Sequence, residues 1–141
     1  MIATGAAWWN GSFHQGQGAI STRSATLRDQ PYTFASRFQG AEGGSPEELL
    51  AAARAACYNH ALANIFHKHD LPVGSIRTQV DVDMGGDTGS PGIESRHITV
   101  RAHMPEVTDE RFQQFAERAA RTCAISRALS VKITLTAVLE P

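Results

Sequence analysis

Residues 45–69 have the sequence SPEELLAAARAACYNHALANIFHKH, which predicts one long helix at the centre of the fold. Ser45 is a favourable N-cap, because its hydroxyl can accept from the free amides of the first turn, and Pro46 suits the first helical position. Glu48, three residues later, completes a capping box. Small and apolar residues then recur at three- and four-residue steps, as on the packed face of a helix. The expected packed face comprises Leu49, Ala53, Ala56, Cys57, His60, Ala61, Asn64, Ile65 and Lys68.

The first forty residues contain strand-forming stretches separated by turns, and we expect three antiparallel strands there. Asn10-Gly11 is a hairpin signal, because this dipeptide readily adopts the positive φ angles of tight turns. The second strand is expected over residues 19–27 and the third over residues 32–38. In the third stretch the aromatic residues alternate with Arg37, which predicts that Arg37 lies on the opposite face of that strand.

The chain after the long helix predicts two strands, a second helix and a final strand. This order of elements indicates an α+β fold, a mostly antiparallel sheet with a long central helix and a second helix packed on it. A chain of 141 residues suits one domain, so we expect a single domain over residues 1–141. The expected bounds are 75–84 and 93–104 for the two strands, 85–92 for the turn between them, 108–122 for the second helix, 123–129 for a short helix or turn, and 131–139 for the last strand.

The long helix has small or apolar residues around much of its circumference, especially over residues 49–56. A helix that is apolar nearly all round must be buried nearly all round, and one small sheet covers only one of its sides. We therefore expect a partner subunit to cover the other side.

The composition excludes several classes of protein. Apolar residues make up 42% of the chain and charged residues 19%, which is ordinary for a globular domain. With 13 basic and 14 acidic residues and no basic stripe, we expect no nucleic-acid partner. No apolar run approaches membrane-spanning length and no signal-peptide pattern is present, so we expect a cytoplasmic protein without a membrane partner.

Four residues are candidates for chemistry: Cys57, Cys123, Arg37 and Glu47. A cysteine in an alanine-rich helix is either a small core residue or a thiol directed at a site. Cys123 lies where one helix ends and another begins, and a helix N-terminus favours the thiolate. For Arg37 and Glu47 the alternative is a surface ion pair worth at most about 1 kcal/mol.

The histidines and glycines do not predict a bound cofactor. His60 and His67 are two turns apart on one helix face, but zinc sites normally need closer spacing together with cysteine or carboxylate ligands. No phosphate-binding GxxxxGK[ST] motif follows the glycines at 40, 43 and 44. We expect neither a metal nor an organic cofactor.

Several of these segments together resemble the OsmC/Ohr family. The run Ser45-Pro-Glu-Glu-Leu-Leu with Ala55-Ala-Cys57 is similar to that family's peroxidatic-cysteine helix, and Cys123-Ala-Ile-Ser126 resembles its resolving-cysteine segment, although the family usually has proline where this chain has Ala124. The segments that resemble the OsmC branch are Trp9-x-Gly11, Gly16-x-Gly18-x-x-Ser21, Pro31-Tyr32-x-Phe34 and Arg37-Phe38-x-Gly40.

This resemblance implies a thiol peroxidase of stress defence that reduces organic hydroperoxides to alcohols. It implies that Cys57 becomes a sulfenic acid and that Cys123 then closes a Cys57–Cys123 disulfide. Arg37 would lower the pKa of Cys57 and bind the peroxide, while Glu47 would hold the guanidinium. The family also implies an intertwined homodimer and a dithiol reductant, either a lipoyl-bearing protein or dihydrolipoamide.

The spacing of Glu47 and Cys57 adds a constraint to that expectation. They are ten residues apart, and a continuous helix would separate them by about 15 Å. Either the helix breaks, or Arg37 and Glu47 serve the Cys57 of the other subunit, which we favour.

Two non-peroxidase functions remain as alternatives from the residues. One is a stress-related protein that binds a small ligand on the same fold and keeps its cysteines inert. The other is an esterase-like hydrolase that uses Cys57 with His60, although no acid is placed to orient that histidine.

Overall fold

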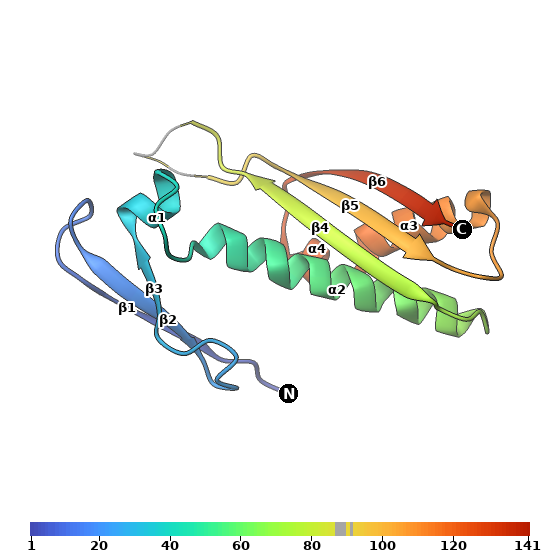
Figure 1. The fold of residues 1–141 in the computed structure, drawn as a ribbon, viewed down its shortest axis with the longest axis horizontal. Coiled ribbons are helices and arrows are strands. Elements are labelled where there is room, and N and C mark those ends of the chain that lie inside the picture. Colours follow the sequence, from blue (N-terminus) through green and yellow to red (C-terminus); the bar gives the residue numbers. More distant parts are fainter. Residues whose placement is uncertain (87–89, 91) are drawn as a thin grey trace. The chain divides into compact units, whose positions relative to one another are not determined.

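The computed structural model describes residues 1–86, 90 and 92–141, and it has the expected mixed α+β architecture (Figure 1). Part of the expected turn at 85–92, residues 87–89 and 91, lies outside the described residues. The chain divides into two compact units, Met1–Leu49 and Leu50–Pro141. The elements are β1 (Gly5–Asn10), β2 (Gln17–Thr22), β3 (Gln30–Thr33), α1 (Phe34–Phe38), α2 (Pro46–Lys68), β4 (Ser75–Asp83), β5 (Ser95–His103), α3 (Asp109–Thr122), α4 (Ala124–Ala128) and β6 (Lys132–Glu140).

The first unit contains the three expected antiparallel strands, in the order β1-β2-β3. The β1–β2 hairpin closes beyond the Asn10↔Gln17 pair, and Gly11 adopts a φ of 94°, a conformation that glycine reaches without steric cost. A Cβ atom on Gly18 would lie 2.3 Å from the Trp8 carbonyl oxygen, so only glycine fits there. Strand β2 ends at Thr22, and the expected continuation to residue 27 is wrong, because the chain turns there.

The third predicted strand, over residues 32–38, is wrong in its second half. Strand β3 ends at Thr33, which caps the short helix α1: the Thr33 hydroxyl accepts from the Ser36 amide at 3.0 Å, and the Ser36 hydroxyl accepts from the Thr33 amide at 2.9 Å. This reciprocal capping satisfies amides that a strand would have paired with its neighbour. Arg37 therefore lies on a helix, with its guanidinium carbon 4.9 Å from the centroid of the Phe38 ring, and not on a face away from the aromatic residues.

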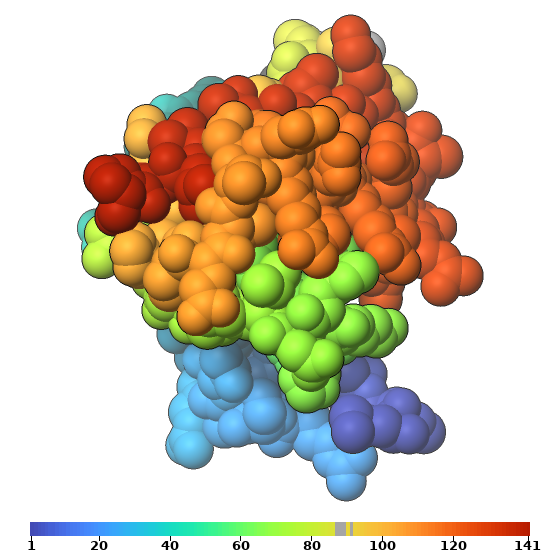
Figure 2. All heavy atoms as spheres, turned by 90° about the vertical axis from the view of Figure 1, so that its right-hand side faces the viewer, coloured from blue at the N-terminus to red at the C-terminus, as the bar shows by residue number. Residues whose placement is uncertain are grey.

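The second unit is a three-stranded sheet, β4-β5-β6, with helices α2 and α3 on one face (Figure 1). Strands β4 and β5 are antiparallel, whereas β5 and β6 are parallel, so the sheets are mostly antiparallel as predicted. The side chains of Ile98, Val100 and Ala102 in β5 are fully buried. Phe66 of α2 and Phe115 of α3 meet edge to face, with their ring centroids 5.2 Å apart. The surface of α3, in orange, adjoins the end of α2, in green (Figure 2).

Helix α2 begins as the sequence predicts, since the Glu48 amide donates to the Ser45 hydroxyl at 3.1 Å. The helix is continuous from Pro46 to Lys68, so the break considered from the spacing of Glu47 and Cys57 is not present.

Within this chain the stripe of larger side chains of α2, and not the predicted stripe of small ones, faces the sheet and α3. The predicted members Ala53, Ala56 and His60 are exposed on this chain, and of the predicted stripe only Ile65 is buried. The buried residues of α2 are Arg54, Tyr58, Leu62, Ile65 and Phe66. A partner subunit over the exposed small residues stays a prediction. No helix in the described part of the chain has the length and hydropathy needed to cross a membrane.

Candidate active site

The two cysteines lie together in the second unit, and neither forms a disulfide. Cys57 comes from the middle of α2 and is partly buried, whereas Cys123 joins α3 to α4 and is only 2% exposed. The two thiols are close enough that each shifts the pKa of the other. Fold and packing thus place two free sulfur atoms side by side, which is the arrangement that a dithiol–disulfide reaction requires.

The surroundings of Cys57 favour its thiolate. Burial by itself raises the pKa of Cys57, but the hydrogen bond from Cys123, the amides of Ile125 and Ala124 and the charge of Arg54 outweigh it, and the pKa falls below its ordinary value. Ala124 and Ile125 are the first residues of α4, whose amides have no partner within the helix. The helix-start stabilisation that we expected at Cys123 therefore acts on Cys57.

The opposite shift is found at Cys123. Burial and the hydrogen bond to Cys57 raise the pKa of Cys123, and the opposing contributions of the Ser126 amide and of Arg54 are too small to reverse this. The expectation of a thiolate at Cys123 is therefore wrong for the reduced protein. Of the two thiols, Cys57 is therefore the first to lose its proton.

Sequence reasoning missed Arg54, which contacts the thiol pair directly. Its side chain is 1% exposed; Nη1 donates to the Cys123 sulfur at 2.6 Å, and Nη2 donates to the Ala120 carbonyl at 2.8 Å. The available signal was that Arg54 is the only charged residue between Glu48 and His60, within an otherwise small and apolar helix segment. A charge at such a place is rarely left buried without a specific partner.

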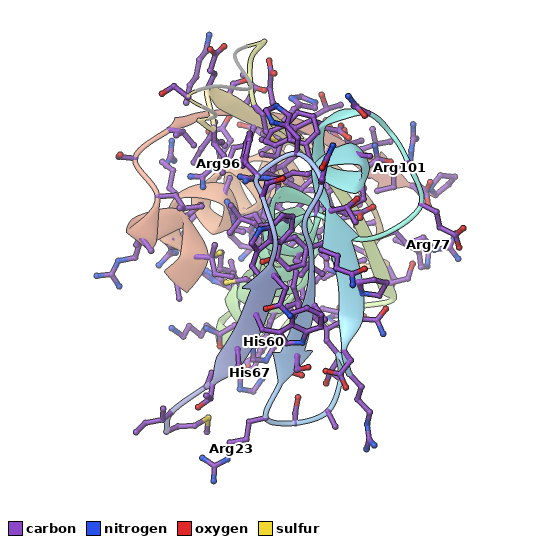
Figure 3. All side chains as sticks on the ribbon, turned by 90° about the vertical axis from the view of Figure 1, so that its left-hand side faces the viewer. Arg23, His60, His67, Arg77, Arg96 and Arg101 are labelled. Carbon is purple, nitrogen blue, oxygen red and sulfur yellow. The ribbon has the colours of Figure 1, made fainter. Side chains whose placement is uncertain are left out.

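A second buried arginine lies close to this group. Arg96, labelled in Figure 3, comes from β5 and is 3% exposed. Burial and the nearby charge of Arg54 lower the pKa of Arg96, while Cys123 raises it. Among the described residues, no carboxylate lies within ion-pair distance of either Arg54 or Arg96. The sulfur atoms are therefore the anionic groups available to these two cations in the described part of the chain.

The first unit holds the other two predicted residues, Arg37 and Glu47, in direct contact. Nε of Arg37 donates to both carboxylate oxygens of Glu47, at 3.0 and 3.1 Å, and Nη2 donates to one of them. These hydrogen bonds raise the pKa of Arg37, so it stays charged at any physiological pH. Arg37 also borders a cavity of about 230 Å³ lined by Trp9, Phe13, Tyr32, Thr33, Phe34 and Phe38.

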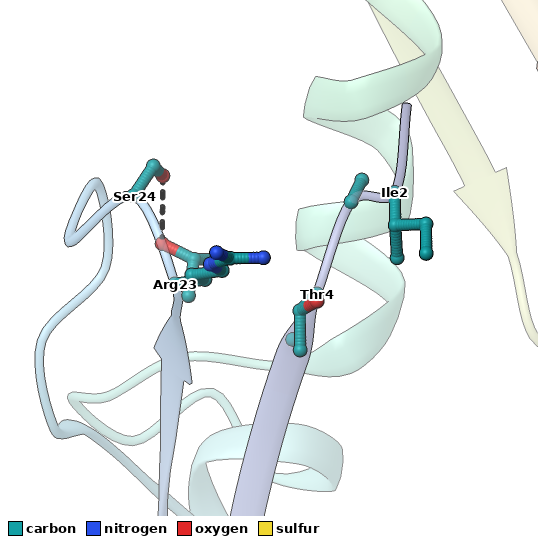
Figure 4. A pocket seen from close by; sticks show the side chains of 7 residues that line it. Ile2, Thr4, Arg23 and Ser24 are labelled. Atoms are coloured by element: carbon teal, nitrogen blue, oxygen red, sulfur yellow. Dashed lines mark hydrogen bonds between the residues drawn. The ribbon is translucent and has the colours of Figure 1, made fainter.

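Other features of the described chain do not gather reactive groups. A cavity of about 600 Å³ lies between residues 2–5 and 22–24, where the hydroxyls of Thr22 and Ser24 are hydrogen-bonded at 3.2 Å, and no cysteine lines it (Figure 4). His60 and His67 are exposed on α2 (Figure 3). Within the described residues, no set of three or more histidine, cysteine or acidic side chains is arranged to hold a metal ion.

The chain is similar to several known proteins. The chain is 35% identical over 133 residues to the peroxiredoxin OsmC of Escherichia coli strain K12, with 93% of this chain and 92% of that protein covered. Its fold matches the crystal structure of an organic hydroperoxide resistance protein from Elizabethkingia anophelis, with a TM-score of 0.71, 24% identity and 99% of both chains covered. It also matches an organic hydroperoxide resistance protein OsmC from Legionella pneumophila, with a TM-score of 0.73, 18% identity and 99% of both chains covered.

The family itself is settled by a family model, whose description is OsmC-like protein and which matches residues 39–137. That range contains both cysteines, Glu47 and all of unit two except its last residues. The predicted family resemblance is confirmed, and the chain belongs to the OsmC-like protein family.

Proposed function

We propose that this protein is a cysteine-based thiol peroxidase that reduces organic hydroperoxides to alcohols in stress defence. The observation that supports it most is the pair of adjacent free thiols, in which Cys57 has a lowered pKa and Cys123 is buried against it. Membership of the OsmC-like family and the 35% identity to a peroxiredoxin support the peroxidase activity. The organic hydroperoxide resistance proteins that share the fold support the choice of peroxide.

In the first step the Cys57 thiolate attacks one oxygen of the hydroperoxide. The O–O bond breaks, an S–O bond forms, and the alkoxide takes up a proton and leaves as the alcohol. Cys57 remains as a sulfenic acid, and its sulfur has given two electrons to the peroxide. The lowered pKa of Cys57 serves this step, since the thiolate is the nucleophile.

In the second step the Cys123 sulfur attacks the Cys57 sulfur. An S–S bond forms, the S–O bond breaks, and hydroxide leaves and becomes water after protonation. The mutual influence of the two thiols in the reduced protein supports this step, because it requires the two side chains to be neighbours before the reaction begins. A dithiol, either a lipoyl-bearing protein or dihydrolipoamide, would then reduce the disulfide.

Arg37 and Glu47 complete the proposal as the group that binds and orients the peroxide. A guanidinium held by a carboxylate presents a fixed pair of donors, and the aromatic cavity beside Arg37 suits an apolar alkyl or aryl substituent. Because α2 is continuous between Glu47 and Cys57, we further propose a homodimer in which Arg37 and Glu47 serve the partner's site. Residues 1–141 would act in it as a single OsmC-like domain.

The test is a count of free thiols before and after one equivalent of cumene hydroperoxide. A peroxidase that forms the Cys57–Cys123 disulfide loses both thiols and releases one equivalent of the alcohol. Loss of neither thiol contradicts the proposal and favours the non-catalytic ligand-binding protein. The Cys57→Ser variant is the matched control, because it should retain its remaining thiol.

A further inference from the structure

We propose that Arg54 is a positioning residue for disulfide formation: it holds the Cys123 sulfur against Cys57 and stabilises Cys123 as the attacking thiolate. The inference rests on the proposed peroxidase function and concerns its second step. It assigns a role to a residue outside the set Cys57, Cys123, Arg37 and Glu47.

The geometry fixes Arg54 at two points. One end of its guanidinium donates to the Cys123 sulfur, and the other donates to the Ala120 carbonyl in the last turn of α3. The same carbonyl also accepts from the Ser126 hydroxyl of α4. Arg54 thus joins α2 to the junction of α3 and α4 on which Cys123 stands. A planar fork held at both ends keeps its donors in place while the sulfur reacts.

The charged groups around Arg54 allow its guanidinium to stabilise a thiolate. The ionisable groups that face it are Cys57 and Tyr58 from α2, Cys123 from the α3–α4 junction and Arg96 from β5. No carboxylate in the described part of the chain forms an ion pair with Arg54. Tyr58 stays neutral, since burial raises its pKa and its hydroxyl donates to the Ala116 carbonyl at 3.1 Å. A guanidinium that is 1% exposed therefore has a thiolate as its available counter-charge.

When Cys57 is oxidised, Cys123 becomes the sulfur that can form the thiolate beside Arg54. In the reduced protein burial raises the pKa of Cys123 most, the hydrogen bond to Cys57 and the negative charge of Cys57 raise it further, and Arg54 opposes these effects. After the first step Cys57 is a neutral sulfenic acid, so its repulsion of a second negative charge is gone while Arg54 remains. Cys123 then releases its proton, attacks the Cys57 sulfur and expels hydroxide, which becomes water. Arg54 thus assists each thiolate in turn.

The experiment separates the two steps in a single turnover with tert-butyl hydroperoxide. Sulfenic acid is trapped at timed intervals with dimedone, and disulfide is quantified by mass spectrometry. In Arg54→Gln, sulfenic acid should form and then persist, with disulfide formation slowed about tenfold or more, the effect of one pKa unit on the thiolate fraction of Cys123. The pH dependence of disulfide formation in Arg54→Gln should move to higher pH than in the wild type. Arg54→Lys should restore the pH profile but only part of the rate, because lysine keeps the charge and loses the fork.

Arg101→Gln is the matched control, because Arg101 is exposed on the other face of β5 and should leave both steps unchanged (Figure 3). If Arg54→Gln does not fold, as judged by circular dichroism, Arg54→Lys alone decides through its slowed disulfide formation. Disulfide formation at the wild-type rate and with the wild-type pH profile in the folded variant overturns the role of Arg54. A wild-type protein that forms neither sulfenic acid nor disulfide overturns the proposed function as well, so the two failures are distinguishable.

Discussion

Arg37 and Glu47 form a doubly bonded pair in which Nε of the arginine donates to both carboxylate oxygens, at 3.0 and 3.1 Å. The pair connects the short helix α1 to the first turn of α2. Its side chains are only partly exposed, 28% for Arg37 and 12% for Glu47, and the guanidinium lies over the Phe38 ring. The result is a charged fork of fixed orientation at the edge of an apolar cavity.

Replacing Arg37 should slow the reaction with peroxide while leaving the fold intact. Arg37→Ala removes one partly exposed ion pair, worth up to about 1 kcal/mol, and one cation–π contact worth about 0.5–1 kcal/mol. The lost orientation of the peroxide should lower the second-order rate with tert-butyl hydroperoxide at least tenfold, the size of one pKa unit in thiolate population. Arg37→Lys should recover part of that loss. A rate equal to that of the exposed control Arg28→Ala would remove Arg37 from the site.

Glu47→Gln should act in the same direction and more mildly. The amide keeps one acceptor for Arg37 but loses the charge that raises the pKa of the guanidinium and one of its two acceptor oxygens. Arg37 stays charged, because a guanidinium keeps its proton at any physiological pH. The effect should therefore appear as a weaker dependence of rate on peroxide structure, measured by comparing cumene and tert-butyl hydroperoxide. The neighbouring Glu48→Gln is the control.

The sequence predicted the order and kind of most elements because their patterns are local. The strand expected over residues 75–84 and the capping signal at Ser45 each depend on near neighbours, and the structure has a strand over Ser75–Asp83 and the cap at Ser45. Residues 32–38 were mistaken for a strand, since alternating aromatic residues suit a strand and a short helix equally. The distinction depends on Ser36, whose hydroxyl bonds to Thr33 and also donates to the Gly44 carbonyl at 2.8 Å.

The candidate site was less predictable, because its contacts join distant segments. Arg54 and Cys123 are separated by 69 positions, and nothing local to either residue indicates the other. The side of α2 that faces the sheet and α3 also differs from the predicted stripe, for a related reason. Small residues pack closely only if a partner approaches, whereas in this chain the sheet and α3 cover the larger side chains Tyr58, Leu62 and Phe66.

The two cysteine variants should differ in their reaction with peroxide and in the products that they form. Cys57→Ser should abolish turnover, because it removes the sulfur that reacts with peroxide. Cys123→Ser should react once and then progress to sulfinic and sulfonic acid at Cys57, because no adjacent thiol removes the sulfenic acid. Mass spectrometry after excess peroxide distinguishes these products by their added oxygen. Normal turnover of Cys123→Ser with dihydrolipoamide, without over-oxidation, would contradict a two-cysteine mechanism.

The pH dependence of the first step follows from the lowered pKa of Cys57. Since the thiolate is the reactive form, the rate should rise with pH through that lowered pKa, and its midpoint should lie below the ordinary cysteine pKa of about 8.5. Cys123→Ala removes a hydrogen bond that lowers the pKa of Cys57, so its half-maximal rate should lie at higher pH. Thiolate absorbance titration provides an independent measurement. A wild-type midpoint above that of free cysteine would be inconsistent with the environment of Cys57.

A mixing experiment should show whether Arg37 acts within one chain or across a dimer. Neither Cys57→Ser nor Arg37→Ala should turn over normally alone. If Arg37 serves the partner's Cys57, a mixed dimer contains one complete site, made of Cys57 from one variant and Arg37 from the other. Random exchange of equal amounts would make half of the dimers mixed, so activity should return to about a quarter of the wild-type value. If Arg37 acts within its own chain, every mixed dimer has two damaged sites and mixing restores nothing.

The control is a mixture of Cys57→Ser with Cys57→Ser,Arg37→Ala, which should stay inactive in either case. Sedimentation of each mixture establishes that dimers form, and a stable, fully active monomer would rule out the shared site.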